Sequence, residues 1–217
     1  ILYSGLLHAQ SRTSAGSLNL GFGKKKVSIS AGYHLNWKVG KKERLALGTG
    51  VRVTSFFGQQ LYYQTAPASI TSGKTGPGVF FTENITENMD SLLVSNPQMN
   101  ALNVLIGINY ELSKRLSIGF SIDAIGFTLG PKRNGNYING QSGAITESKP
   151  TAFNLLLISD NDLGTLNSDL LLAYQLNEQI KLSAGFQFLF TEYTTATQVQ
   201  QFPEPNDRFR NKGAMAS

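Results

Sequence analysis

Hydrophobic residues recur at every second position along most of this chain, a spacing that predicts β-strands rather than helices. From Val27 to Trp37 the alternate residues are apolar, and the residues between them are small or polar. After the turn residues 39–43 the alternation resumes and continues from Leu45 to Val53. This order of strand, tight turn and returning strand predicts a β-hairpin.

The same hairpin unit is repeated further along the chain. Two more copies occupy residues 102–124 and 170–190. Their turn regions align without a gap, Tyr-Glu-Leu-Ser-Lys-Arg-Leu at 110–116 against Tyr-Gln-Leu-Asn-Glu-Gln-Ile at 174–180. A repeated hairpin predicts a protein that is built as a meander of antiparallel strands.

Short and long connections alternate between the expected strands. Further alternating segments near Leu18 and Arg208 bring the expected strands to eight. The turns within hairpins are short, whereas the connections between hairpins are long and polar and span about residues 58–100, 130–166 and 193–207. In an up-and-down meander the short turns share one rim and the long loops share the other. This asymmetry is typical of β-barrels in membranes.

Strand length supports the same conclusion. The expected strands have about 10 to 13 residues, whereas strands in soluble sheets usually have about 5 or 6. Such strands are long enough to cross an apolar band of about 25 Å at a tilt. We therefore predict an all-β fold, an eight-stranded antiparallel up-and-down transmembrane β-barrel whose apolar face meets lipid and whose polar face is enclosed.

Aromatic residues mark both ends of the expected strands. Those that precede the short turns are Trp37, Tyr110 and Tyr174. Those that lie where strands meet the long loops are Phe57, Phe127, Phe190 and Tyr193. Amphipathic rings are enriched at the level of the lipid headgroups. We predict that these residues form two aromatic girdles.

The opposite faces of the strands carry glycine and polar residues, which suit a narrow, hydrogen-bonded interior. Six of these polar residues are ionisable, and we expect them to form a polar network in the lumen: His34, Lys38, Arg52, Glu111, Asp123 and Asp169. The interior of an eight-stranded barrel is narrow enough for side chains to fill. We therefore expect no open channel.

Two hairpin segments resemble a known family. Gly-Ile-Asn-Tyr-Glu-Leu at 107–112 and Ser-Ile-Gly-Phe-Ser-Ile-Asp at 117–123, with the Tyr174 and Phe186 repeat, are similar to small bacterial outer-membrane β-barrels of the OmpX and OmpA-transmembrane-domain kind. The resemblance covers roughly residues 14–217 and includes no diagnostic functional motif. It implies integral insertion in the outer membrane of a Gram-negative bacterium.

The two ends of the sequence carry further expectations. Residues 1–9 are apolar or small and precede a polar run that begins at Gln10, as at the end of a secretory signal peptide. We expect the barrel to occupy residues 10–217; the alternative is that residues 1–9 form an apolar first strand. Members of the resembled family usually end in an aromatic residue. This chain ends in Ser217, so we interpret its last strand as incomplete.

Composition narrows the function classes. Charged residues make up 15% of the 217 residues, against about 25% in typical domains. No apolar run reaches the roughly 18 residues of a transmembrane helix, and the chain has no cysteine for disulfides or thiolate sites. The net charge is +5, but the basic clusters lie in turns and loops on both rims. We therefore expect no nucleic-acid surface, which would gather them on one face.

The sequence offers little support for catalysis. Outside residues 1–9, His34 is the one histidine, and it lies on an inward face next to Asn36, whereas barrel lipid A deacylases have a His-x-Ser arrangement. The segment 68–75 resembles a phosphate-binding loop, but a Gly-Pro-Gly sequence follows where a helix should begin. The segment 160–164 lacks the spacing of a calcium loop. We predict no catalytic residue, metal or cofactor.

We expect function to reside in the long loops. The best candidate contact region is the 58–100 loop, in which Phe80 and Phe81 are the expected apolar contacts. The apolar residues 79–81 and 92–94 of this loop could form an added hairpin or a partner-binding edge. Lys132 and Arg133 are expected to contact lipopolysaccharide phosphates. The expected partners are outer-membrane lipids, lipopolysaccharide and an extracellular or envelope protein, with the chain itself a monomer.

Three alternatives remain open at this point. A soluble, lipocalin-like barrel that binds a small apolar ligand requires Ile106 and Phe120 to point inward. A lipid-modifying barrel enzyme requires His34 to act as the base. A narrow pore requires a conducting lumen.

Overall fold

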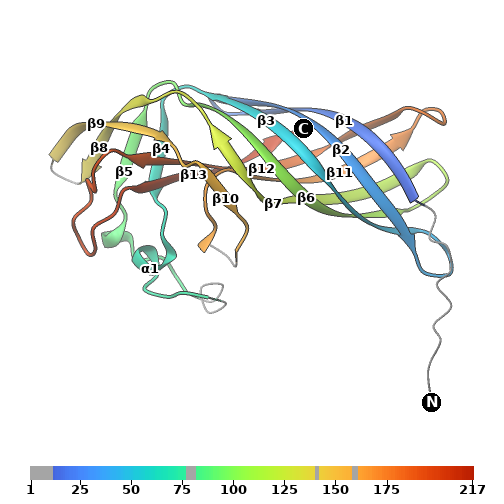
Figure 1. Ribbon diagram of the computed structural model, residues 1–217, viewed down its shortest axis with the longest axis horizontal. Helices are drawn as coiled ribbons and strands as arrows, with labels where there is room; N and C mark the ends of the chain where they lie inside the picture. The colour runs from blue at the N-terminus through green and yellow to red at the C-terminus, as the bar shows by residue number, and fades with distance from the viewer. Residues whose placement is uncertain (1–11, 77–81, 140–141, 158–160) are drawn as a thin grey trace, which may run out of the picture.

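The structure is a computed structural model that describes residues 12–76, 82–139, 142–157 and 161–217. The predicted signal-peptide remnant, residues 1–9, lies outside the described residues. Thirteen strands form one antiparallel sheet that curls into an elongated barrel (Figure 1). The short helices are α1 (Ala68–Thr71) and η2 (Thr86–Asn88). In the described part of the chain, no helix has the length and apolarity needed to cross a membrane.

The strands predicted from hydrophobic alternation are present, with lengths of 9 to 15 residues. They are β1 (Arg12–Gly23), β2 (Lys26–Val39), β3 (Leu45–Gly58), β6 (Gln98–Glu111), β7 (Leu116–Leu129), β11 (Leu166–Gln175), β12 (Lys181–Thr195) and β13 (Arg208–Ala216). Further strands lie inside the predicted loops. They are β4 (Leu61–Thr65), β5 (Ser91–Val94), β8 (Arg133–Asn139), β9 (Ser142–Pro150) and β10 (Phe153–Leu155).

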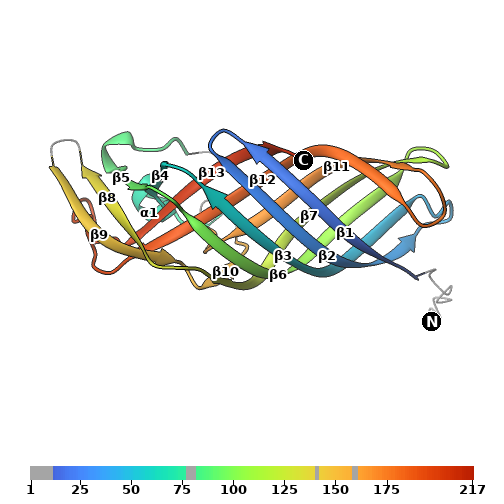
Figure 2. The ribbon, with the colours of Figure 1, turned by 90° about the horizontal axis from the view of Figure 1, so that it is seen from above.

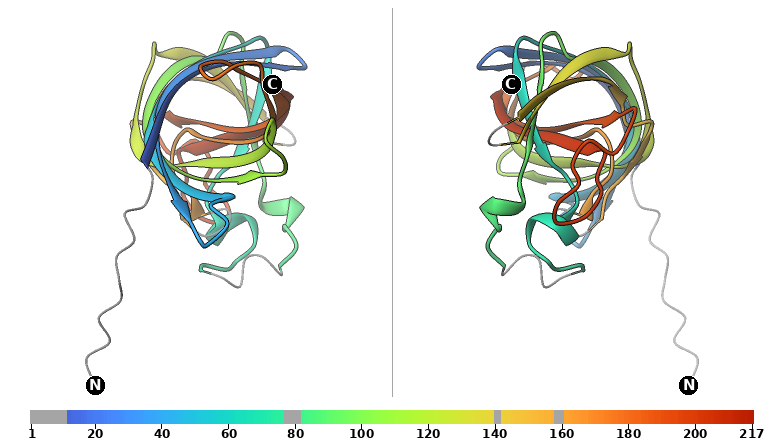
Figure 3. Two further views of the ribbon diagram at one scale, coloured as in Figure 1. Left: turned by 90° about the vertical axis from the view of Figure 1, so that its right-hand side faces the viewer. Right: turned by 90° about the vertical axis from the view of Figure 1, so that its left-hand side faces the viewer.

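The sheet closes on itself. Its order is β10-β7-β11-β12-β9-β8-β5-β4-β13-β1-β2-β3-β6, and β6 also pairs with β7. A ring of twelve strands results, with β10 attached to β7 outside it. Within this ring, β12 also pairs directly with β13, so β9, β8, β5 and β4 form a second path between these two strands. Strands β4, β5, β8 and β9 extend the wall beyond the ends of β12 and β13, at the end of the molecule away from the β2–β3, β6–β7 and β11–β12 turns (Figure 2; end views in Figure 3).

The predicted eight-stranded barrel is wrong, because the sheet has thirteen strands. The segments 58–100 and 130–166 were expected to be loops, yet they contain β4, β5, β8, β9 and β10. Several of these strands are short, and their buried faces include Thr65, Thr146 and Ser148 beside apolar residues. A search for apolar residues at every second position does not detect such mixed faces.

Side chains on the long strands have the inverse orientation of those in a soluble protein. Along β6, Leu102, Val104 and Ile106 are exposed, while the alternate residues Asn103 and Leu105 are buried. Cross-strand register extends this outer apolar face around the barrel, because Val104 lies opposite Val51 on β3. The predicted orientation, with apolar residues outward and polar residues enclosed, is confirmed. The lipocalin-like alternative fails on this point, because Ile106 and Phe120 lie outside.

An apolar core fills the interior at the loop end. Its members are Phe56, Leu61, Tyr63, Leu92, Val94, Met99, Tyr137, Leu189, Tyr193, Phe209 and Met215. The rings of Tyr63 and Tyr193 meet edge to face with centroids 5.1 Å apart. Tyr193 was predicted to lie in an outward girdle, and this position is wrong, because the side chain is fully buried. Tyr193 lies on the inward face of β12 with Leu189 and Thr191, and residues of β4, β5 and β8 belong to the same apolar core.

The other girdle residues lie on or near the outer surface. Tyr110, Tyr174, Phe57 and Phe127 are exposed, and Trp37 and Phe190 are half-buried. Their contact with lipid headgroups stays a prediction. The segment 92–94 does form an added strand, β5. It is not a partner-binding edge, because β5 pairs with β4 on one side and β8 on the other.

Candidate functional site

A buried ion cluster crosses the lumen near the middle of the long strands. Arg52 on β3 contacts Asp169 on β11, with 2.9 Å from Nη2 to Oδ2. It also contacts Asp123 on β7, with 3.4 Å from Nη1 to Oδ1. At most 3% of any of the three side chains is exposed. Alternation explains the arrangement, because each residue occupies an inward position of its strand.

Amide side chains hold the carboxylate of Asp123 in place. Asn103 on β6 donates from Nδ2 to Asp123 Oδ2 at 2.7 Å, and the backbone N–H of Asn167 donates to the same oxygen at 3.0 Å. Asn154 on β10 donates to Asn103 Oδ1 at 2.7 Å. A Cβ at Gly126 would lie 2.1 Å from that same oxygen, so glycine is required for the close approach of β6 and β7.

A second buried contact lies beside the ion cluster. The hydroxyl of Ser28 on β2 donates to Gln187 Oε1 on β12, and both side chains are buried. Gln187 lies directly opposite Asp169 in the β11–β12 register. Together Ser28, Gln187, Arg52, Asp123 and Asp169 form what we call the polar layer, which links β2, β3, β7, β11 and β12 through the interior.

The polar layer has a charge imbalance with a physical consequence. One guanidinium group faces two carboxylates in a region that water does not reach. Burying charged groups is unfavourable unless they are paired and hydrogen-bonded, so Arg52 and the surrounding amides offset part of the cost of burying the two carboxylates. The ion pairs and the hydrogen bond of the layer join strands from different parts of the barrel wall.

The remaining predicted lumen residues form two separate contacts. Lys38 and Glu111 make an ion pair of 3.0 Å between Nζ and Oε1 near the short turns, and both side chains are partly exposed. His34 contacts Ser17 at 2.9 Å between Nε2 and Oγ. The structure therefore unites Arg52 with the two aspartates but keeps His34, Lys38 and Glu111 outside that cluster.

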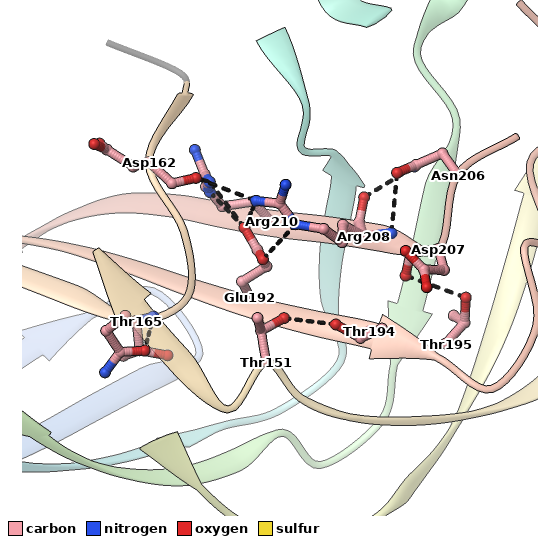
Figure 4. Close-up of polar contacts among 11 residues, drawn as sticks. Thr151, Asp162, Thr165, Glu192, Thr194, Thr195, Asn206, Asp207, Arg208 and Arg210 are labelled. Carbon is pink, nitrogen blue, oxygen red and sulfur yellow. Dashed lines mark hydrogen bonds and ion pairs between the residues drawn. The ribbon is translucent and has the colours of Figure 1, made fainter. Parts of the chain in front are cut away.

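Sequence reasoning missed a second ion cluster, which Figure 4 shows. Glu192 on β12 is fully buried and accepts hydrogen bonds from Arg208 Nε at 2.9 Å and Arg210 Nη2 at 2.8 Å. Both arginines also donate to the backbone carbonyl of Asp162. Glu192 lies on the same face of β12 as the outward Phe188, and its backbone carbonyl accepts a hydrogen bond from the backbone N–H of Thr151. The sequence predicted an alternating segment at Arg208 and Arg210, but it did not predict their contact with Glu192.

Lys132 and Arg133, two of the predicted surface residues, make separate contacts. Lys132 forms an exposed ion pair with Glu147 at 2.8 Å, whereas Arg133 Nη2 donates to Gln98 Oε1 at 3.2 Å. Phe80 and Phe81 lie outside the described residues. A small cavity of about 120 Å³ at the loop end is lined by Lys132, Glu147, Ser148, Lys149, Thr194, Thr195 and Ala196.

The loop-end wall contains a buried tyrosine with altered acidity. Tyr137 on β8 is buried and donates a hydrogen bond to the carboxylate of Asp90 at 2.5 Å. Burial, assisted by this hydrogen bond, raises the pKa of Tyr137 to about 12. Burial also raises the pKa of Tyr63 on β4 well above its usual value. Within the described ranges, no group of three or more acidic or histidine side chains is arranged to hold a metal ion.

Comparisons with known proteins found weak similarity in structure alone. The sequence matches no described protein family, and no curated protein is detectably similar to it. The toluene transporter TbuX of Ralstonia pickettii aligns over 88% of this chain and 49% of its own, with 12% identity and a TM-score of 0.28. The monoaromatic hydrocarbon channel CymD aligns over 91% and 55%, with 10% identity and a TM-score of 0.25. This chain therefore spans about half the length of either protein, and scores this low say nothing about function.

Proposed function

We propose that this chain is an integral β-barrel protein of the bacterial outer membrane, with a closed lumen and a surface-binding role at its loop end. The observation that carries the proposal is the inverted distribution of side chains. Leu102, Val104, Ile106 and Phe120 are exposed on the outside, while Arg52, Asp123 and Asp169 are buried inside.

Solvation energy favours a membrane around the long strands. Exposed apolar area is unfavourable in water by about 25 cal/mol per Å², and soluble monomers seldom expose a continuous apolar patch of more than a few hundred Å². Here the exposed apolar residues follow one another along the long strands other than β13. A bilayer removes this surface from water, and a closed ring leaves few backbone groups without partners in the hydrocarbon.

The polar layer supports a closed lumen. Its side chains are almost inaccessible to solvent, and the apolar core fills the interior between this layer and the loop end. An ion that crossed the barrel would have to break the Arg52 contacts and displace the core. We propose a role that does not depend on conduction.

Charged side chains at the loop end support a binding role there. Lys132 and Lys149 line the small loop-end cavity together with Glu147, Ser148, Thr194 and Thr195. In the proposed orientation this rim faces outward, where lipopolysaccharide phosphates lie. Lysines are suitable donors to phosphate, so lipopolysaccharide is the proposed ligand.

The membrane location can be tested by cysteine accessibility, because the chain contains no cysteine. Ile106 and the loop-end residue Ile145 are both exposed in the isolated chain. We expect Ile106→Cys in lipid vesicles to resist a water-soluble maleimide and to react after detergent is added. Ile145→Cys should react in both conditions. Equal labelling of the two variants in intact vesicles would refute the membrane location.

The lipid-modifying enzyme remains an alternative because Ser17 and His34 are in hydrogen-bond contact. A serine nucleophile needs a base that is itself oriented by a third group. In the described residues no hydrogen bond joins His34 to a carboxylate. We expect His34→Ala to leave the membrane lipid profile unchanged, as determined by mass spectrometry; an altered profile would favour the enzyme.

A further inference from the structure

The outer wall carries accessible cations where β1, β2 and β13 reach the loop end. Lys24 and Lys25 form the turn between β1 and β2, and both are exposed. On β13, the side chain of Arg208 is 25% exposed and Lys212 is half-buried. Phe209, the residue after Arg208, belongs to the apolar core, so Arg208 and Lys212 point outward. We call Lys24, Lys25, Arg208 and Lys212 the basic patch.

The turn between β1 and β2 lies against β13, as Figure 2 shows. Lys26, which follows the turn, donates from Nζ to Asn211 Oδ1 on β13 at 3.3 Å. The turn also meets the β3–β4 connection, where the backbone N–H of Gln59 donates to the carbonyl of Lys25 at 2.9 Å. Because the turn and β13 are adjacent, the lysines of the turn and the outward cations of β13 lie on one surface.

The strands that carry the basic patch contain no acidic residue. Strands β1, β2, β3, β4 and β13, all of which lie within the described residues, have neither aspartate nor glutamate. Arg208 contacts Glu192 on the neighbouring strand β12, and Arg210 shares this carboxylate. Among the described residues, Lys24 and Lys25 form no ion pair. A surface with cations of one sign attracts anionic groups.

The basic patch lies at the level of the predicted aromatic girdle of the loop end. Phe190 lies opposite Lys212 in the β12–β13 register, and Nζ of Lys212 is 5.8 Å from the centroid of its ring. On the other side of the patch, Phe57 lies opposite Val27, two residues beyond Lys25. Aromatic rings are enriched where hydrocarbon meets the lipid headgroups. The cations therefore face the headgroup layer and not the hydrocarbon.

We infer that the basic patch binds the phosphate groups of lipid A, the lipid part of lipopolysaccharide, from the side of the barrel. The acyl chains then lie against the apolar outer face of the strands, next to residues such as Ile29 and Phe188. Lysine and arginine donate charge-assisted hydrogen bonds to phosphate oxygens. This binding mode rests on the proposed membrane location, and it adds a second site to the loop-end cavity.

The spacing of the cations fits a headgroup with more than one phosphate. Arg208 and Lys212 are four residues apart, which is about 13 Å along a strand. Thr194, which lines the loop-end cavity, lies opposite Arg208 on β13 and opposite Lys149 on β9. The basic patch and the cavity are thus neighbours across β12. Two separated phosphates match such a row of cations better than one phosphate does.

Binding can be measured by native mass spectrometry of the protein in detergent micelles, with lipid A that carries two phosphates as the probe. We expect the double variant Lys24→Gln and Lys25→Gln to bind about tenfold more weakly than the wild type. The variant Lys24→Arg and Lys25→Arg retains both charges and should bind as the wild type does. A matched control, Lys41→Gln and Lys42→Gln, removes two exposed lysines from the β2–β3 turn at the opposite end. This control should leave binding unchanged.

Further arms separate the basic patch from the cavity and from free phosphate. Lys132→Gln with Lys149→Gln removes the cations of the cavity alone. If this variant weakens binding and the glutamines at Lys24 and Lys25 do not, the basic patch is refuted while the proposed function stands. The reverse result upholds the basic patch and refutes the cavity. Failure of the membrane location is detected separately, by the labelling of Ile106→Cys.

Two other results would also overturn the basic patch as a lipid A site. One is an equal loss of binding in the matched control, which would show attraction to net charge without a defined site. The other is displacement of lipid A by inorganic phosphate in excess, which would favour a site for free phosphate. We expect no displacement, because the acyl chains contribute to binding. Lipid A with a single phosphate should bind more weakly than the form with two.

Discussion

At the scale of single residues, stability depends on charges that are buried inside the barrel. Arg52 is the cation that faces both Asp123 and Asp169. Lys38 and Glu111 form an ion pair of similar length, but their side chains are 27% and 46% exposed. Breaking a buried pair leaves an uncompensated charge, whereas an exposed pair contributes little. The two pairs therefore provide a matched comparison within one molecule.

We predict that Arg52→Ala lowers the free energy of unfolding by about 3 to 5 kcal/mol. Lys38→Ala should lower it by less than about 1 kcal/mol. Urea unfolding in detergent micelles, followed by tryptophan fluorescence and by the mobility of unboiled protein, measures both changes. Equal destabilisation by the two substitutions would contradict the assignment of Arg52 to the polar layer.

Tyr137 gives a pH dependence whose sign follows from its environment. Its pKa is raised to about 12 in the folded protein, from an ordinary value of 10.0. The protonated form is thus favoured by folding, so the stabilising contribution is complete below pH 10 and is lost as the pH rises through 12. We predict that Tyr137→Phe reduces the loss of stability between pH 10 and 12. The exposed Tyr62→Phe should retain the wild-type profile in the same urea titration, and identical profiles for both variants would refute the assignment.

At the scale of elements, the outer faces of the long strands should respond to charge according to depth. Ile106 lies near the middle of β6, whereas Ile145 lies on β9 at the loop end. An arginine on the lipid face costs about 2 to 4 kcal/mol at the bilayer midplane and about 0 to 1 kcal/mol near the interfaces. We predict such a cost for Ile106→Arg and almost none for Ile145→Arg. Unfolding in vesicles measures both, and two small effects would contradict a bilayer around β6.

The sequence predicted the long strands of the barrel but not the short strands at the loop end. The long strands follow from apolar residues at every second position, because lipid and lumen impose opposite demands on alternate side chains. Strand β8 has an inward face with Gly135 and Tyr137, and no apolar repeat distinguishes it from a polar loop. It is held by pairing with β5, which is distant in the sequence, and with β9, which also lies in a segment that was expected to be a loop.

At the scale of the whole molecule, ring closure and the filled interior decide permeability. The polar layer and the apolar core lie in series along the barrel interior. We predict that the protein reconstituted in planar bilayers gives no stepwise ion currents. A known porin in the same bilayers provides the positive control. Reproducible unit currents that increase with the amount of protein would favour the narrow pore instead.

The candidate site was partly visible in the sequence. Inward positions for Arg52, Asp123 and Asp169 follow from alternation, but their contact does not, because it depends on which strands face each other across the ring. Sequence reasoning grouped His34 and Lys38 with them, although these residues lie elsewhere in the barrel. Glu192 gave no signal, because its two arginines are brought to it by the β12–β13 pairing, and both of them also donate to the distant backbone carbonyl of Asp162.

The sequence by itself determined the long strands and the face of each that is turned outward. A period of two with few charges is a local property, and it has the same meaning wherever a strand lies in the sheet. Only the tertiary structure decided the number of strands and the partners of Tyr193, Arg52 and Glu192. These depend on hydrogen bonds and packing between segments far apart in the chain, and local alternation does not specify which segments meet.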